Sequence, residues 1–409
     1  MDINSEFDVI IVGGGMVGAA QAVAFTRQNK RVLLIENHLP QLEWLDNPPL
    51  RVSAVNLFSE KYLTELGIWP HISEQSSCVF NHLATWEKQN SEKVVFSAED
   101  ISQPQLGYLT RNEALQLAAY DVFKELENPP CIISDVELCN ICQSDNDVIV
   151  TLKSSENNHV SEIPENNINS EIKEVKAKLL IGADGANSAV RRLANIGTSG
   201  WDYQQHCLSI TIKTEFQQQD ITWQEFQPSG PKAFLPLNNG YASLIWYDAV
   251  ETIKSLKQLD NAQLKTEVLN IFPQLAGDFE VVQCASFPLT RRQANQYCSG
   301  RIVLIGDAAH TINPLAGQGV NLGYKDVSEL SSLLDDVSFD NNTDISKALR
   351  KYQHKRKAES LVMSAAMDSF YSLFSNDKTP LKLMRKTLLS VANKLPWAKK
   401  QVLKKAVGY

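Results

Sequence analysis

The stretch that decides the fold is FDVIIVGGGMVG, residues 7–18. Its first six residues are mostly apolar and rich in β-branched side chains, which is typical of a buried parallel strand. The glycines that follow have the spacing Gly13-x-Gly15-x-x-Gly18. In such a turn the first glycine permits a tight bend and the second lets a pyrophosphate approach the backbone. The third lets the next helix pack closely against the strand.

The residues after this turn complete a dinucleotide-binding unit. Residues 19–25 favour a helix, and residues 31–35 form a second apolar strand that ends at Glu36. Glu36 lies 23 residues after Gly13, where such units carry the carboxylate that binds a ribose hydroxyl. Phosphates would bind the free N–H groups at the positive end of the helix. The sequence therefore predicts an adenine dinucleotide site rather than a glycine-rich turn that binds nothing.

The composition is that of a globular protein. Of the 409 residues, 43% are hydrophobic and 21% are charged. No run of 18 apolar residues occurs and residues 1–8 are polar and acidic, so we expect neither a membrane-spanning helix nor a secretory signal. The seven cysteines are scattered, and Cys139-x-x-Cys142 has no second pair at zinc spacing. These features predict a cytoplasmic protein with structural cysteines and no bound metal.

The net charge of −8 is unevenly distributed along the chain. Residues 351–409 carry a balance of +10, so residues 1–350 carry −18. An acidic body argues against nucleic-acid binding. The basic tail, whose charges alternate with apolar residues, predicts peripheral contact with the anionic cytoplasmic face of the inner membrane. The alternative is that its apolar face docks on the body and its lysines are solvated.

Two further motifs follow predicted strands far along the chain. Residues 177–182 lead into Asp184-Gly185, with Ser188 and Arg191 behind them. Residues 301–305 lead into Gly306-Asp307, and a helix that begins after it carries a third group of candidates: Pro314, Gly317, Gln318, Gly319 and Asn321. Because ligands bind at the carboxyl edge of a doubly wound sheet, we expect the three motifs to form one site.

Two residues of these motifs have simpler interpretations. Asp184 is well suited to cap the helix that follows it, and this role is as plausible as a cofactor contact. His310 invites an acid–base role, but a single histidine after a strand is more often a packing or hydrogen-bonding group. No G-x-S-x-G, H-E-x-x-H or Walker pattern occurs, so hydrolase and nucleotide-triphosphatase functions have no support.

The three motifs together resemble the group A flavoprotein aromatic hydroxylases, which have the para-hydroxybenzoate hydroxylase fold. The resemblance implies FAD, NAD(P)H or another transient reductant, and O2 as co-substrate. FAD would be noncovalent, because no position resembles the His or Cys attachment site of covalent flavoproteins. It also implies an α/β fold: a Rossmann-like FAD-binding domain with an inserted, mainly antiparallel β-sheet substrate domain and a C-terminal helical segment.

The resemblance assigns roles to individual residues. Asp184 would lie near the FAD pyrophosphate and the NAD(P)H path, and Asp307 would contact the ribitol. Arg51 would lie by the ribose phosphates, and Gln116 beside the same cofactor. Pro314 would lie at the re face of the flavin, where the C4a-hydroperoxide forms.

A physical argument also places the helix that begins near Gly317, Gly319 and Asn321 at the flavin. Its positive end would point at the flavin N1–C2 carbonyl region, which favours the anionic reduced flavin. We therefore include these three residues in the predicted cofactor site, together with Gly13, Gly15, Gly18 and Glu36.

Within this family the match narrows to the ubiquinone-biosynthesis hydroxylases, which residues 306–326 resemble. Residues 223–226, 233–237, 246–248 and the tail resemble the branch that hydroxylates demethoxyubiquinol. This implies hydroxylation of a ring carbon of a prenylated benzoquinol. The alternatives are a related flavin hydroxylase of another ubiquinone-pathway or phenolic substrate, and a non-catalytic FAD scaffold in the biosynthetic assembly. Other ubiquinone-biosynthesis proteins and a second copy of the chain are open as partners.

The expected domains alternate along the chain. The FAD-binding part comprises residues 1–75, 111–205 and 291–340. The substrate domain comprises residues 76–110 and 206–290, where apolar and polar residues alternate at strand period. Residues 341–409 form the basic helical region, and residues 154–174 read as a polar hairpin tip. Phe234, Leu235 and Trp246 are expected either to line a groove for the prenyl tail or to belong to the core.

Overall fold

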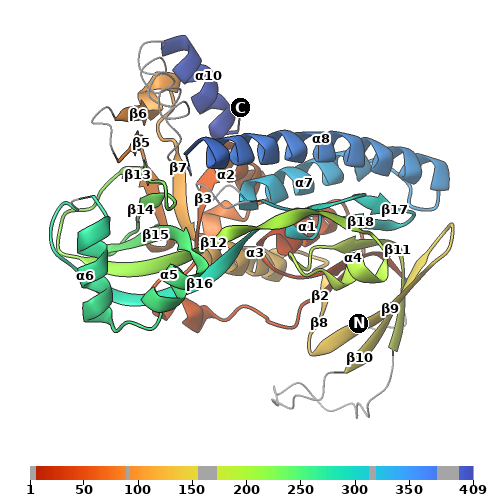
Figure 1. Cartoon of the computed structure of the whole chain (residues 1–409). Helices are drawn as coiled ribbons and strands as arrows, with labels where there is room; N and C mark the ends of the chain where they lie inside the picture. Colours follow the sequence, from red (N-terminus) through yellow and green to blue (C-terminus); the bar gives the residue numbers. More distant parts are fainter. Residues whose placement is uncertain are drawn as a thin grey trace.

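The computed structural model describes residues 6–88, 93–154, 173–273, 275–312, 319–374 and 396–408. Most of the predicted hairpin tip, together with Pro314 and Gly317, lies outside these ranges. Two large sheets lie side by side, and α8 (Asn342–Phe374) runs along them (Figure 1). A third, three-stranded sheet joins β3 (Val52–Asn56), β7 (Gly107–Arg111) and β4 (Ser77–Phe80).

The first sheet is built on the strand quoted above. β1 (Phe7–Val12) pairs in parallel with β2 (Val32–Ile35) and β11 (Lys173–Gly182). β18 (Ile302–Leu304) continues the sheet in parallel beyond β11, and β8 (Cys131–Ile133) does so beyond β2. Its antiparallel members are β9 (Val136–Gln143), β10 (Val148–Ser154) and β17 (Cys298–Ser299). The parallel order brings the carboxyl ends of β1, β11 and β18 to one edge.

The first sheet packs against helices that are far apart in sequence. α1 (Met16–Arg27) lies between α3 (Asn112–Glu125) and α7 (Gly319–Leu334), and α8 packs on α7. The strands β1 and β2 are almost entirely buried, as expected for a parallel sheet under helices. The remaining helices of this region are α2 (Leu57–Glu65) and α4 (Ala189–Leu193).

The second sheet has the order β19-β16-β12-β15-β14-β13-β5-β6. Only β13 and β5 pair in parallel. The strands are β5 (His82–Glu87), β6 (Val94–Ser97), β12 (Thr198–Thr214), β13 (Ile221–Phe226), β14 (Lys232–Pro236), β15 (Tyr241–Ala249), β16 (Phe279–Ala294) and β19 (His310–Thr311). The mainly antiparallel inserted sheet is therefore confirmed, while its exact domain boundaries stay a prediction.

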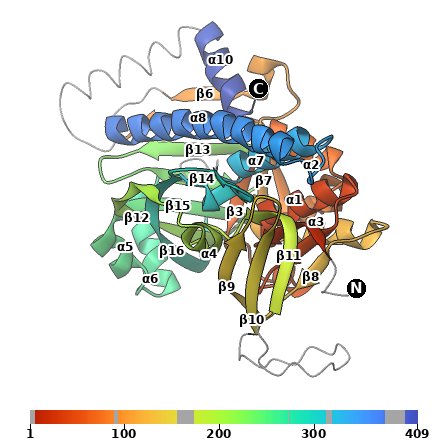
Figure 2. The same cartoon turned by 90° about the vertical axis from the view of Figure 1, so that its right-hand side faces the viewer.

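Two helices within the inserted segment escaped the sequence analysis. α5 (Val250–Leu256) and α6 (Asn261–Ile271) cover one face of the second sheet (Figure 2). Asp260 caps α6, because its carboxylate accepts a hydrogen bond from the backbone N–H of Gln263 at 2.8 Å. This acid before a run of helix formers was the local signal for a helix.

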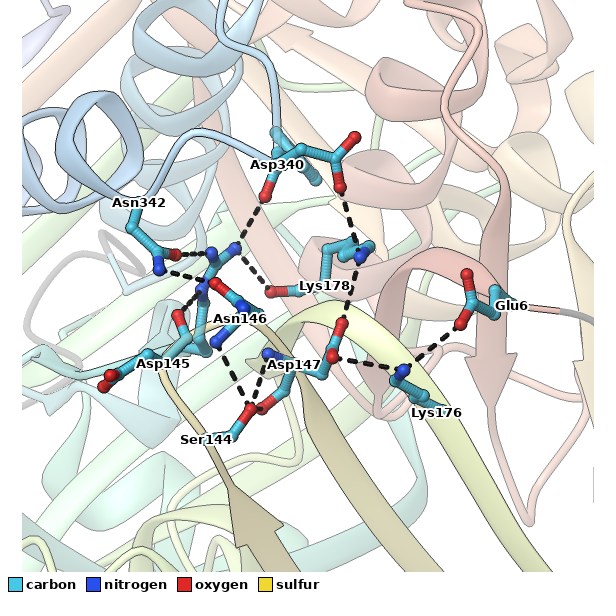
Figure 3. Close-up of polar contacts among 11 residues, drawn as sticks. Glu6, Ser144, Asp145, Asn146, Asp147, Lys176, Lys178, Asp340 and Asn342 are labelled. Atoms are coloured by element: carbon cyan, nitrogen blue, oxygen red, sulfur yellow. Dashed lines mark hydrogen bonds and ion pairs between the residues drawn. The ribbon is translucent and has the colours of Figure 1, made fainter.

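A polar cluster holds β11 at Lys176 and Lys178, where this strand begins to pair with β1 (Figure 3). The Nζ atoms of Lys176 and Lys178 each lie 3.1 Å from the Asp147 carboxylate. Arg301, which is 3% exposed, donates to the carbonyls of Asp145, Lys178 and Phe339. These contacts join the β9–β10 turn to the segments that precede β18 and α8.

No helix in the described ranges is both long and apolar enough to cross a bilayer. All seven cysteines are free thiols, and the described residues contain no cluster of histidine, cysteine and acidic side chains suited to a metal.

Candidate active site

The three glycines of the first turn meet three different surroundings. Gly13 has φ +98°, and a Cβ there would lie 2.5 Å from the Ala183 carbonyl oxygen. A Cβ on Gly18 would lie 1.9 Å from the Gly13 oxygen, so helix and strand pack too closely for any side chain. Around Gly15, apart from its neighbours in the chain, no atom of the described residues lies within 4 Å of such a Cβ. The bend and the close packing are as predicted, and Gly15 faces open space.

Glu36 and Gln116 both lie at this turn. The Glu36 carboxylate accepts hydrogen bonds from the backbone N–H groups of Gly14 at 2.6 Å and His38 at 2.7 Å. The Gln116 side chain donates to the Gly14 carbonyl at 3.0 Å. A carboxylate oxygen has two lone pairs, so these bonds leave Glu36 able to accept a ribose hydroxyl as well. Its ribose contact stays a prediction.

In the second motif Asp184 contributes to the capping of α4, whose N-cap residue is Ser188. Its carboxylate accepts from the Ser188 hydroxyl at 2.5 Å and from the Val190 N–H at 3.0 Å, at the start of α4. The simpler interpretation of Asp184 is therefore confirmed, and the FAD contact stays a prediction. Arg191, on the same helix, donates to the Ala308 carbonyl at 2.7 Å. This bond ties the second motif to the third.

The third motif rests on a buried charge network that the sequence analysis missed. Asp326 on α7 accepts from the Gly306 N–H at 2.8 Å and lies 2.6 Å from His310 Nε2. Its other oxygen accepts from Arg356 Nε at 2.7 Å. Asp326, His310 and Arg356 are each at most 2% exposed. We call these three residues the Asp326 network.

The Asp326 network keeps its carboxylate charged. Burial alone would raise the pKa of Asp326, but the neighbouring His310 and Arg356 bring it below its ordinary value. The hydrogen-bonding interpretation of His310 is confirmed, since its ring lies against Asp326. The missed signal was an acid on the buried face of α7, beside Tyr324, Val327 and Leu330.

Asp307 and Asn321 differ in what they contact. Asp307 follows Gly306 in the short turn at the end of β18, and its side chain is exposed at the sheet edge. Asn321 is buried and holds α7 against β3. Its amide accepts from the Asn56 N–H at 3.0 Å and donates to the Ala54 carbonyl at 2.7 Å. Asn321 thus positions the first turn of α7, and its contact with the cofactor stays a prediction.

The remaining predicted residues complete the edge. Arg51 is exposed immediately before β3, and its carbonyl accepts from the Asn112 N–H at 3.1 Å. Gly319 begins α7, and among the described residues outside its own stretch of chain no atom lies within 4 Å of an added Cβ. Pro314 and Gly317 fall outside the described residues, so their roles stay predictions.

The residues present fit a dinucleotide. Gly15, Gly185 and Gly319 all face open space, one in each motif. The N-terminus of α1 has no side-chain cap, so its N–H groups are available for phosphate oxygens. Open backbone and a positive helix end on one sheet edge are the features that a bound pyrophosphate requires.

Beside this edge lies an apolar cavity of about 150 Å³, which we call the ring cavity. It lies between β3 and β7 on one side and the second sheet on the other. Asn56, the partner of Asn321, lines it, so the cavity adjoins the third motif. The apolar part of its wall includes Ala54, Leu109, Trp223, Leu235, Tyr247 and Phe287.

The expected groove residues divide between two faces of the second sheet. Leu235 lines the ring cavity, but Phe234 and Trp246 belong to the core beneath α5 and α6. Of the two alternatives, the core interpretation therefore holds for Phe234 and Trp246, because successive side chains of a strand point to opposite faces. On β15 it is Ile245 and Tyr247, the neighbours of Trp246, that face the cavity.

A parallel cofactor edge beside an antiparallel sheet with a ring-sized cavity is the architecture of an FAD-dependent aromatic monooxygenase. The solved structure of p-nitrophenol 4-monooxygenase PnpA from Pseudomonas putida DLL-E4 has the same fold. It superimposes with a TM-score of 0.78 over 98% of both chains, at 17% identity.

Sequence comparison identifies the family. The family described as FAD binding domain matches residues 6–365. The 3-demethoxyubiquinol 3-hydroxylase of Escherichia coli (strain K12) is 39% identical over 99% of both chains. The mitochondrial ubiquinone biosynthesis monooxygenase COQ6 of Danio rerio is 30% identical, over 98% of this chain and 89% of that protein. The chain therefore belongs to the FAD-binding monooxygenase family, and it is an enzyme.

Proposed function

We propose that this protein hydroxylates a ring carbon of a prenylated benzoquinol in ubiquinone biosynthesis, the step from demethoxyubiquinol to demethylubiquinol. The observation that carries the proposal is the ring cavity, which is apolar and adjoins the cofactor edge. Apolar cavities of about this volume accept a single benzene ring. Similarity over nearly the full length to a demethoxyubiquinol hydroxylase supports this choice among ring substrates.

Each part of the site has a role in this reaction. Bound FAD, reduced by NAD(P)H or another donor, would deliver one oxygen atom of O2 to the ring. The glycine turn, Glu36 and Asp307 would hold the cofactor on the sheet edge. The cavity wall would orient the ring and exclude water from the reaction.

The described part of the cavity wall contains no strong base. Within the described residues, no aspartate, glutamate, histidine, lysine or arginine lines it. Burial raises the pKa values of Cys207 and Tyr247, which do line it, so both stay protonated near neutral pH. This favours a substrate whose own hydroxyl groups activate the ring, as a quinol's do. Gln224, which also lines the cavity, would bind a quinol hydroxyl.

The experiment that tests the proposal is hydroxylation by the purified FAD-loaded protein under ¹⁸O2. A prenylated demethoxyquinol should gain one labelled oxygen, detected by mass spectrometry, and plain phenols should not. Labelling of a plain phenol instead would favour a hydroxylase of soluble substrates. Tight FAD binding without turnover of any ring would favour the scaffold. Deletion of the gene should cause the demethoxyquinone to accumulate.

Peripheral membrane contact through α10 (Pro396–Ala406) is part of the proposed function. This helix has features that support both interpretations of the tail, contact with a membrane and docking on the body. Its inner face docks on the body, where Lys399 pairs with Asp100 at 2.8 Å. Its outer face carries Trp397, which is 69% exposed, with Lys400 and Lys405 nearby. Residues 375–395, which hold most of the other basic and apolar residues of the tail, lie outside the described ranges.

A further inference from the structure

Helix α10 forms one wall of the ring cavity. Leu403 and Val407 are 2% and 4% exposed and, with Ala406, line the cavity. In both views α10 lies beside β6, at the edge of the second sheet (Figure 1, Figure 2). The two buried side chains pack in a cluster with four residues of the body: Leu57, Ala98, Ile101 and Leu106.

The cavity is too small for a prenylated substrate as a whole. Its volume of about 150 Å³ accommodates one ring. A polyprenyl tail is several times larger than the ring that carries it, so the tail must leave the cavity through one of the walls. This step rests on the proposed function, which supplies the prenylated substrate.

The walls differ in how they are held. β3 is paired with β7, and β13, β14 and β15 are paired with one another, so a passage between strands would break ladder hydrogen bonds. Within the described residues α10 is held mainly by side-chain packing. The Phe58 N–H donates to the Val407 carbonyl at 3.3 Å, and Lys399 pairs with Asp100. A tail can therefore pass beside α10 at a lower cost than through a sheet.

An apolar stripe on α10 leads outward from the cavity. Ala406 is at the rim, lining the cavity while remaining exposed. Val402, one helical turn earlier on the same face, is 59% exposed. The polar side chains of Gln401 and Lys405 lie on the outer part of the helix and are exposed. We infer that the prenyl tail leaves the ring cavity along Val402 and Ala406, which makes α10 the element that selects long-tailed quinols.

The test compares a long-tailed quinol with an analogue that carries a methyl group in place of the tail. Val402→Trp adds bulk to the apolar stripe outside the ring cavity and should raise KM for the long-tailed quinol roughly tenfold, while KM for the analogue stays unchanged. Gln401→Trp adds the same bulk to the outer face and should change neither value. Quenching of tryptophan fluorescence by the two quinones, compared between these two matched variants, gives the same discrimination as dissociation constants.

Val402→Lys provides a second variant, because this exposed position can be changed without disturbing the packing of α10. It should weaken binding of the long-tailed quinol alone. FAD content and the thermal transition check that each variant is folded. Equal losses for both quinols, or no loss for either in Val402→Trp and Val402→Lys, would overturn the inference while the proposed function stands. Failure of the wild-type protein to hydroxylate any prenylated quinol would overturn both.

Discussion

The Asp326 carboxylate accepts a hydrogen bond from the Gly306 N–H at 2.8 Å, across 20 residues of sequence. The bond joins the buried face of α7 to the turn that presents Asp307. Because Arg356 on α8 binds the other carboxylate oxygen, three segments of the chain meet at one buried charge. The position of the third motif therefore depends on the ion pair between Asp326 and Arg356. In the proposed arrangement this pair does not contact the cofactor.

Asp326→Asn should destabilise the protein by roughly 3–5 kcal/mol, because it removes the buried partner of Arg356 and leaves that charge only Glu359, whose side chain is 44% exposed. Denaturant unfolding of the apoprotein measures this loss. Glu329→Gln on the same helix is the matched control. Its partner Lys355 is 54% exposed, so a loss of about 0–1 kcal/mol is expected there. Equal losses for the two variants would contradict the role of the network.

Gly15→Val should abolish FAD binding and leave the apoprotein folded. Gly15 has φ −67°, and a Cβ added there meets no described atom beyond its chain neighbours, so valine should fit the fold but would occupy the place of the pyrophosphate. Flavin fluorescence titration and circular dichroism measure the two effects. Gly13→Val, by contrast, should disturb the fold, since φ there is +98° and the Ala183 carbonyl is in the way. Normal FAD content in Gly15→Val would exclude this turn as the pyrophosphate site.

Asp307→Ala should weaken FAD binding by roughly 1.5–3 kcal/mol, the usual value of a hydrogen bond to a charged group. Its exposed side chain predicts no loss of apoprotein stability. Asp307→Asn keeps a hydrogen-bond acceptor but not the charge. Its affinity for FAD should fall between the affinities of the wild type and Asp307→Ala. Titration of the apoproteins with FAD gives the affinities, and an unchanged value for Asp307→Ala would remove this residue from the site.

Lys232 should make stability depend on pH in the alkaline range. Its Nζ is fully buried and donates to the Tyr247 carbonyl at 2.8 Å, and burial lowers the pKa of Lys232 to about 8. Between pH 8 and 10 the unfolded chain keeps the proton that the folded chain has lost, so the Lys232 contribution to stability rises with pH. At about 1.4 kcal/mol per pKa unit, the rise over this window is on the order of 2–3 kcal/mol.

The difference between wild type and Lys232→Met isolates this rise, because the buried thiols and phenols act alike in both proteins. Urea unfolding at pH 8, 9 and 10 provides the three values. Parallel stability curves for the two proteins would show that Lys232 titrates in its ordinary range.

The outer lysines of α10 should bind the protein to anionic vesicles at low salt. Replacing Lys400, Lys404 and Lys405 with Gln should weaken binding by up to about 1 kcal/mol per residue, and added salt should do the same. Lys399 is left in place because it pairs with Asp100. Vesicle co-sedimentation measures the effect, with the exposed Lys254 of α5 and Lys257 just after this helix changed to Gln as the control. If wild type ignores anionic vesicles, substrate must be delivered by another route.

The sequence predicted the features that depend on residues close together in the chain. The strand, glycine turn and acid of residues 7–36 predicted the parallel unit, because each feature acts within a few residues of itself. Gly13 adopts the positive φ that a tight turn needs, and Asp184 caps the helix that begins five residues later.

Only the tertiary structure decided which partner each of these elements meets. Period-two alternation separates the two faces of a strand but does not say which face α5 and α6 cover. Only the structure shows that Phe234 lies in the core beneath these helices and that Leu235 lines the cavity. The burial of the Asp326 carboxylate is explained only by its contacts with Gly306 and Arg356, which are distant in sequence. The sequence alone determined the cofactor-binding unit, since turns and helix ends are local. The ring cavity and its α10 wall came from packing between residues more than 100 positions apart, which no local pattern encodes.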